Sequence, residues 1–66
     1  MEIIVNGHLQ QVQWAYTAAQ LVEDLELTGK RIAMEVNQEI VPRSQYGSYG
    51  FQSGDKIEIV HAIGGG

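Results

Sequence analysis

One segment of the sequence has the pattern of a helix, and this segment limits what the remaining residues can form. Apolar residues recur at helical spacing from residue 18 to about residue 28, with acidic residues between them. Thr17 and Gln20 have the spacing of a capping box, which predicts a helix start at Ala18, and Gly29 is predicted to cap the C-terminal end. The predicted buried face consists of Ala18, Leu21, Val22 and Leu25. A chain of 66 residues makes one domain, so this helix must cover one face of a sheet.

The N-terminal residues predict a β-hairpin. Residues 1–5 are rich in strand formers and are followed by Asn6-Gly7, a dipeptide that readily forms a tight hairpin turn. Residues 10–14 then alternate polar and apolar, with Val12 and Trp14 on one side. This alternation predicts a half-buried second strand, antiparallel to the first.

The residues after the helix predict two further strands and a short extended segment. The third strand is Ile32–Val36, with Ile32, Met34 and Val36 facing inward. A turn at residues 37–39 leads to a short segment, Ile40-Val41, which Pro42 closes because proline cannot donate to a ladder. Residues 44–53 form an irregular loop with one helical turn after Ser44, in which Tyr46 or Phe51 packs on the core. A turn at residues 53–55 precedes the last strand, residues 56–63.

This order of elements resembles the β-grasp, or ubiquitin-like, fold. It implies an α+β domain in which a mixed sheet of four to five strands is covered on one face by a single helix. We expect residues 1–63 to form this domain and residues 64–66 to form a flexible glycine tail.

Composition and charge exclude several classes of function. The chain has no cysteine, so disulfides, thiolate zinc sites and cysteine nucleophiles are excluded. Its formal charge is -4 and its four basic residues are scattered, which argues against nucleic acid as a partner. His8 and His61 are far apart and lack the spacing of metal ligands, so no metal site is predicted. No apolar stretch approaches the length of a membrane span, and we expect a cytoplasmic protein.

Gly64, Gly65 and Gly66 follow the last predicted strand. Three glycines have no side chain to bury, so they contribute nothing to a core. They can enter a channel that would reject any side chain, and the tip of such a strip carries one reactive group, an α-carboxylate. The alternative interpretation is a frayed end or a cloning remnant.

Two segments narrow the resemblance from a fold to a family. The first segment is Val36-Asn37, followed after three residues by Val41-Pro42-Arg43. The second is Ser53-Gly54-Asp55-Lys56, together with the strand that continues from it to the glycines. Both resemble the ThiS family of sulfur carriers in thiamine biosynthesis. The resemblance covers essentially the whole chain.

The resemblance implies a carrier and not an enzyme. In this family a ThiF-type adenylyltransferase uses MgATP to adenylate the C-terminal glycine, here Gly66, which is then converted to a thiocarboxylate. The sulfur passes to the thiazole ring on a thiazole synthase, ThiG. Gly64 and Gly65 would thread the tail into the partner. The carrier itself would bind no cofactor and would be a monomer when free.

Strand alternation also predicts a docking surface. If Ile3, Val5, Ile57 and Ile59 face inward, the open face of the sheet carries Ile4, Ala33, Glu35, Glu58 and Val60. An apolar patch with an acidic rim fits a protein interface. We expect Ile4 and Val60 to anchor the activating enzyme and the two glutamates to meet basic residues on it.

Two alternatives remain open at this point. The first is a molybdopterin-type sulfur carrier or a ubiquitin-like protein tag, since the glycine tail is common to all of these. The second is a β-grasp interaction module whose tail is inert.

Overall fold

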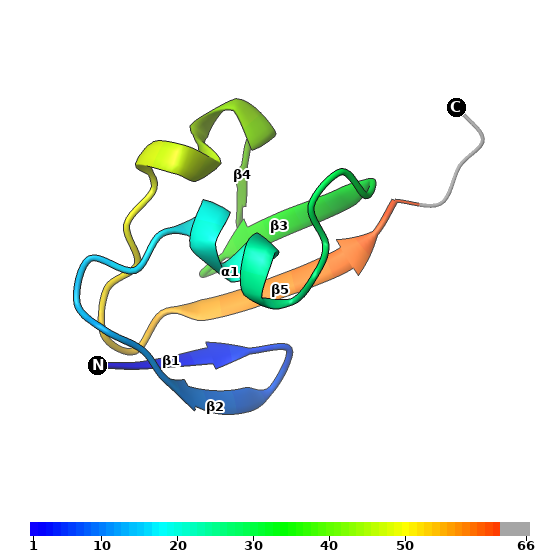
Figure 1. Ribbon diagram of the computed structural model, residues 1–66. Coiled ribbons are helices and arrows are strands. Elements are labelled where there is room, and N and C mark those ends of the chain that lie inside the picture. Colours follow the sequence, from blue (N-terminus) through cyan, green and yellow to red (C-terminus); the bar gives the residue numbers. More distant parts are fainter. Residues whose placement is uncertain (63–66) are drawn as a thin grey trace.

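The computed structural model describes residues 1–62, which form a mixed five-stranded sheet with one α-helix packed across one face (Figure 1). The elements are β1 (Glu2–Val5), β2 (His8–Gln11), α1 (Ala18–Asp24), β3 (Ile32–Val36), β4 (Glu39–Val41), the 3-10 helix η1 (Arg43–Ser48) and β5 (Lys56–His61). The predicted α+β architecture is confirmed. Residue 63 of the last predicted strand and the glycines 64–66 lie outside the described residues.

The strand order places β5 at the centre of the sheet. The order is β2-β1-β5-β3-β4, and β5 is parallel to β1 and antiparallel to β3. All other neighbours are antiparallel. The strand that precedes the glycines is therefore held on both edges, by the first strand of the chain and by β3.

The predicted hairpin turn is confirmed, but the second strand begins and ends earlier in the sequence than predicted. Asn6 and Gly7 have φ of 49° and 83°, as a tight hairpin turn requires. β2 ends at Gln11. The chain then turns at Ala15, whose φ is 70°, in order to reach the helix. The prediction that Trp14 belongs to this half-buried strand is wrong, because the strand ends before it and its side chain is 74% exposed.

The helix begins where the sequence predicts. The Thr17 hydroxyl accepts a hydrogen bond from the Gln20 backbone N–H at 3.2 Å, and the Gln20 side chain accepts one from the Thr17 N–H at 2.9 Å. This capping box satisfies two donors that the first helical turn leaves unpaired.

The helix ends one turn earlier than predicted. Glu26 adopts a left-handed φ of 59°, and the N–H groups of Glu26 and Leu27 donate to carbonyls at Glu23 and Val22. This pair of hydrogen bonds is a Schellman motif, which ends α1 at Asp24. Gly29, predicted as the cap, instead lies in the next turn, and its φ is 79°.

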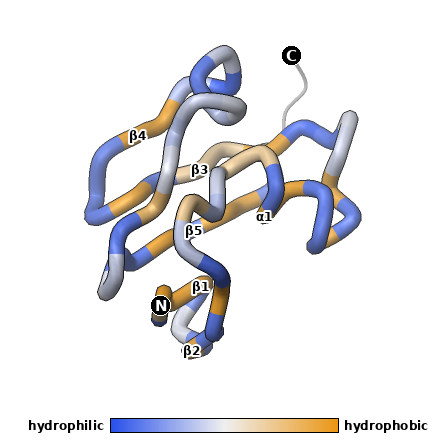
Figure 2. Tube along the Cα trace, turned by 60° about the vertical axis from the view of Figure 1, so that its left-hand side comes forward, coloured by the Kyte–Doolittle hydropathy of each residue, from blue (hydrophilic) through white to orange (hydrophobic). Residues whose placement is uncertain are grey.

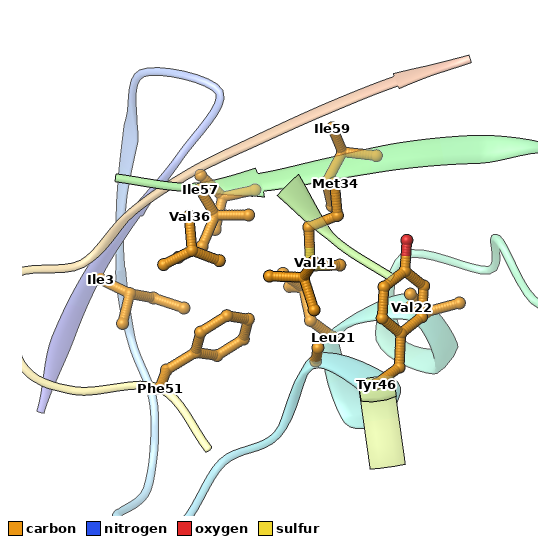
Figure 3. Close-up of a cluster of buried hydrophobic side chains, with 12 residues drawn as sticks. Ile3, Leu21, Val22, Met34, Val36, Val41, Tyr46, Phe51, Ile57 and Ile59 are labelled. Carbon is orange, nitrogen blue, oxygen red and sulfur yellow. The ribbon is translucent and has the colours of Figure 1, made fainter. Parts of the chain in front are cut away.

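The core lies between α1 and the inner face of the sheet. Figure 3 shows side chains from the sheet on the side that carries Leu21 of the helix, with Met34 and Val41 near Leu21, and Val36 and Ile57 above Phe51. Tyr46 from η1 and Phe51 after it are both buried and close the far side of this core. The predicted inward set is thus largely confirmed. Leu25 is an exception, because it follows the helix end and is exposed.

A polar network fastens the start of β5. Asp55 is 8% exposed, and its carboxylate accepts hydrogen bonds from the Asn37 side chain at 3.0 Å and the Gln52 N–H at 2.8 Å. The Asn37 amide oxygen accepts from the Lys56 N–H at 3.0 Å. Asn37 and Asp55 belong to the two segments that carry the family resemblance, and their contact gives both a structural role.

Arg43 belongs to the same resemblance and also has a structural contact. Its guanidinium donates to the backbone carbonyl of Lys30, which ties η1 to the loop before β3.

Candidate functional site

The face of the sheet opposite α1 is covered by no element of the described chain. Along β5, inward Ile57 and Ile59 are buried, while the intervening Glu58 and Val60 are exposed. Figure 2 shows the corresponding alternation of hydrophilic and hydrophobic positions along the strands. We call this exposed side of the sheet the open face.

The structure places the five predicted docking residues together on the open face. Val60 lies opposite Ala33, and Glu58 lies opposite Glu35, on the paired strands β5 and β3. Ile4 is their counterpart on β1, where Ile3 and Val5 point into the core. Val60 is the most exposed apolar member, at 57%. Their common position agrees with the predicted alternation, while their role in docking stays a prediction.

Two further apolar residues extend the open face, and sequence reasoning missed both. Leu9 on β2 lies opposite Ile4, and Ile40 on β4 lies opposite Glu35. Both side chains are more than half exposed, at 62% for Leu9 and 63% for Ile40. The correct hairpin register would have revealed Leu9, because a residue opposite Ile4 in an antiparallel pair shares its face.

The open face therefore carries apolar residues on four strands around an acidic pair, and the exposed Lys56, aligned with Ile4, shares this face. Leu9, Ile4, Val60 and Ile40 are distributed across four strands, and the carboxylates of Glu35 and Glu58 lie between them. Like charges on directly opposite residues destabilise a sheet. A partner that placed a cation over these carboxylates would remove the repulsion and bury the apolar residues at the same time.

The described residues contain neither a cluster of metal ligands nor a membrane-spanning helix. Within residues 1–62, no group of three or more histidine, cysteine, aspartate or glutamate side chains could hold a metal ion. The same residues contain no helix that is long and apolar enough to span a membrane.

The predicted tail residues Gly64, Gly65 and Gly66 lie outside the described residues. The last described residue, Ala62, follows β5 directly, and its N–H donates to the Arg31 carbonyl at 2.9 Å. The open-face residue Val60 lies two positions before it on the same strand.

The sequence is similar to a sulfur carrier protein and to thiazole synthases. The ThiS family model matches residues 3–66. The sulfur carrier protein ThiS of Escherichia coli is 35% identical over 66 residues, which cover both chains completely. Thiazole synthases of Paramagnetospirillum magneticum and Magnetococcus marinus are 38% and 36% identical over the same length. The chain spans 20% of the length of each of these two synthases.

A solved structure has the same fold over the complete chain. The crystal structure of the thiamine biosynthesis protein ThiS from Geobacter metallireducens superposes with a TM-score of 0.85, at 25% identity, and covers all of both chains. The NMR structure of a thiamine biosynthesis protein from the same organism has a TM-score of 0.74.

Proposed function

The chain belongs to the ThiS family, and on this premise we propose that it is a sulfur carrier of thiamine biosynthesis. Gly66 would be adenylated and then converted to a thiocarboxylate, whose sulfur goes to the forming thiazole ring. The observation that carries the proposal is the family match from residue 3 to residue 66, which includes the glycines as well as the fold.

The proposed chemistry explains why an activating partner is required. A free α-carboxylate has a pKa of about 3.5 and is an anion at neutral pH, so it repels nucleophiles and has no leaving group. Adenylation converts it into a mixed anhydride from which AMP can leave. A sulfur nucleophile then attacks the carbonyl carbon, the bond to the AMP oxygen breaks, and sulfur replaces one carboxylate oxygen.

The carrier would act in these steps as a substrate and not as an enzyme. We propose that a ThiF-type adenylyltransferase binds the MgATP and supplies the groups that stabilise developing charge. The carrier would contribute binding energy through its folded domain, remote from the reacting atom. We expect the free carrier to be a monomer in the cytoplasm.

We propose that the activating enzyme docks on the open face. Ile4 and Val60 would anchor it, with Leu9 and Ile40 widening the apolar contact, and Glu35 and Glu58 would pair with basic residues. Support comes from the exposed apolar residues around an acidic centre on a chain of net charge -4.

We propose that the sulfur is delivered to a thiazole synthase of the ThiG type. Support comes from the two thiazole synthases, each of which contains a segment similar to the whole of this chain. Joining two partners in one chain raises their effective concentration, which is useful when the two act on the same intermediate.

Intact mass spectrometry tests the proposal. The protein ending at Gly66 is incubated with a ThiF-type enzyme, MgATP and a sulfur donor, and we expect the mass increase of one oxygen-to-sulfur exchange at Gly66. Conjugation to a lysine would instead identify a protein tag. An unchanged mass, under conditions that activate a control carrier, would contradict both functions.

Two variants locate the reaction on the tail. Removal of Gly66 should abolish sulfur loading because the terminal carboxylate, now on Gly65, sits one residue closer to the domain and no longer reaches the position where it reacts. Addition of one alanine after Gly66 should also abolish loading because the terminal carboxylate then belongs to alanine. Neither change should alter the free energy of unfolding, since the glycines follow the last core residue, Ile59. Loading of the alanine-extended protein would show that the terminal glycine is not required.

A further inference from the structure

A groove on the helix side of the hairpin is not used by the proposed function. It has a volume of about 660 Å³ and runs between residues 10–16 and α1. Its lining includes Gln10, Gln13, Trp14, Gln20, Asp24 and Leu25. The open face lies on the opposite side of the sheet, so a molecule in the groove would leave the proposed docking surface accessible.

Trp14 is the most exposed large apolar side chain among the described residues. At 74% exposure it contributes almost nothing to the core, yet the turn that presents it contains Ala15 at a φ of 70°. A left-handed conformation is unfavourable for alanine. Exposed tryptophan is uncommon on free surfaces and frequent at the centre of binding sites, because its ring offers a large rigid contact area.

Asp24 gives the groove its charge. The Tyr16 hydroxyl donates a hydrogen bond to the Asp24 carboxylate, which holds this acid at the groove wall formed by α1. None of the four basic residues of the chain is among the lining residues, whereas several glutamine amides are. The groove thus combines an aromatic face, an oriented carboxylate and amide groups without an internal cation.

We propose that this groove binds an arginine side chain presented by a segment of a partner protein. The guanidinium would stack on the Trp14 ring, where the aromatic face attracts a cation, and would donate hydrogen bonds to Asp24. Arginine fits better than lysine because its planar group can stack and donate in a fork at the same time. The acidic character of the chain favours a basic partner segment over an acidic one.

This proposal does not depend on sulfur transfer. It rests on the exposed Trp14, on Asp24 in the lining of the same groove and on the absence of a basic lining residue, and it would hold for a β-grasp protein of any function. A protein that takes up no sulfur in the mass-spectrometry experiment would therefore not contradict the arginine site. A groove that binds no arginine would likewise not contradict the carrier function.

Titration of the ¹⁵N-labelled protein with two short peptides tests the proposal. The probes are acetyl-Gly-Arg-Gly-amide and acetyl-Gly-Glu-Gly-amide. Trp14 is the only tryptophan, so its indole N–H gives a single resonance for the groove. We expect the arginine peptide to shift this resonance and the Asp24 amide in a saturable way, and the glutamate peptide to leave both unchanged. The lysine analogue should bind more weakly than the arginine peptide.

Matched variants distinguish binding in the groove from attraction by the net charge of the protein. Asp24→Asn should reduce the affinity for the arginine peptide by about threefold or more. Glu23→Gln removes the same charge from the neighbouring position of α1, which does not line this groove, and should leave affinity unchanged. Trp14→Ala, followed through the Asp24 amide, should remove binding without unfolding the protein, since the ring is largely exposed.

Three results would overturn the proposal. The first is the absence of saturable shifts with the arginine peptide. The second is an equal effect of Glu23→Gln and Asp24→Asn, which would indicate attraction by net charge alone. The third is a set of shifts confined to the open face, which would place the cation site on Glu35 and Glu58.

Discussion

Glu35 and Glu58 lie directly opposite each other on β3 and β5, between the apolar residues of the open face. A sheet gains nothing from two facing carboxylates, and their repulsion lowers its stability. In the proposed docking, the same pair would give a basic partner a defined point of attachment. Stability and recognition therefore make opposite demands on these two residues.

Replacing one of the two glutamates should change stability and partner recognition in opposite directions. Glu58→Gln is expected to raise the free energy of unfolding by about 0.2–1 kcal/mol, because it removes the repulsion from Glu35. The same change should slow association with the activating enzyme, most clearly at low salt. Urea unfolding and stopped-flow association measure the two effects. Glu23→Gln on α1 is the control for net charge, and an equal association rate for Glu58→Gln and the unaltered protein would remove the glutamates from the interface.

Val60 tests the apolar part of the open face. Val60→Asp should reduce the rate of adenylation by about tenfold or more, because an anchor worth over 1.4 kcal/mol is lost. Val60→Thr keeps the branched shape and should cause a smaller loss. Circular dichroism checks that both variants fold. Normal adenylation of a folded Val60→Asp protein would show that Val60 is not an anchor.

The buried carboxylate of Asp55 is expected to stabilise the fold without touching a partner. Asp55→Ala leaves the Gln52 N–H and the Asn37 side chain without their acceptor, at a cost of about 1–3 kcal/mol in the free energy of unfolding. Asp55→Asn keeps one acceptor oxygen and should cost less. Urea denaturation at neutral pH measures both variants, and an unchanged midpoint for Asp55→Ala would contradict a stabilising network.

The turn between β3 and β4 can be improved. Asn37 and Gln38 have φ of 52° and 71°, so this turn has the backbone of an Asn-Gly hairpin without its glycine. Gln38→Gly should raise the free energy of unfolding by about 1 kcal/mol, because glycine has no penalty for a left-handed conformation. Gln38→Ala is the control and should be close to neutral. A lower thermal midpoint for Gln38→Gly would contradict this account.

Alkaline pH should destabilise the protein. Burial raises the pKa of Tyr16, Tyr46 and Tyr49, and the hydrogen bond to Asp24 raises that of Tyr16 further. Phenols in the unfolded chain ionise at about pH 10, so the folded state binds more protons above this pH and stability falls as pH rises. Below it, these groups cause no pH dependence.

Urea unfolding across a pH series, together with phenolate absorbance, measures this effect. Tyr16→Phe should reduce the alkaline loss of stability. The three tyrosines of the chain all have a raised pKa, so a phenol that ionises in the folded protein at the ordinary pKa would contradict the prediction.

The sequence predicted those elements that short-range rules determine. Asn6-Gly7 specifies its turn through local backbone preferences, and Thr17 with Gln20 specifies the helix start through two reciprocal hydrogen bonds. Strand β3 was predicted to the residue because its alternation is unbroken. The position of the predicted docking residues followed from the same alternation, since the side facing the core determines the side facing outward.

The predictions that were wrong depend on tertiary contacts or unfavourable backbone angles. The helix end was misplaced because Glu26 adopts a left-handed conformation that sequence preference assigns to Gly29. The prediction for Trp14 was wrong because the alternation of polar and apolar residues continues beyond residue 12, where the backbone pairing with the start of the chain ends. Leu9 and Ile40 were missed because their face depends on the register with β1 and β3.

The parallel pairing of β1 with β5 also determines how the domain responds to force. The start of β1 and the end of β5 lie at opposite ends of this strand pair, so tension between the two chain ends slides the strands along each other. The hydrogen bonds that join them then carry the load together instead of breaking one after another. A pull on β5 from its C-terminal side would therefore load these hydrogen bonds in shear.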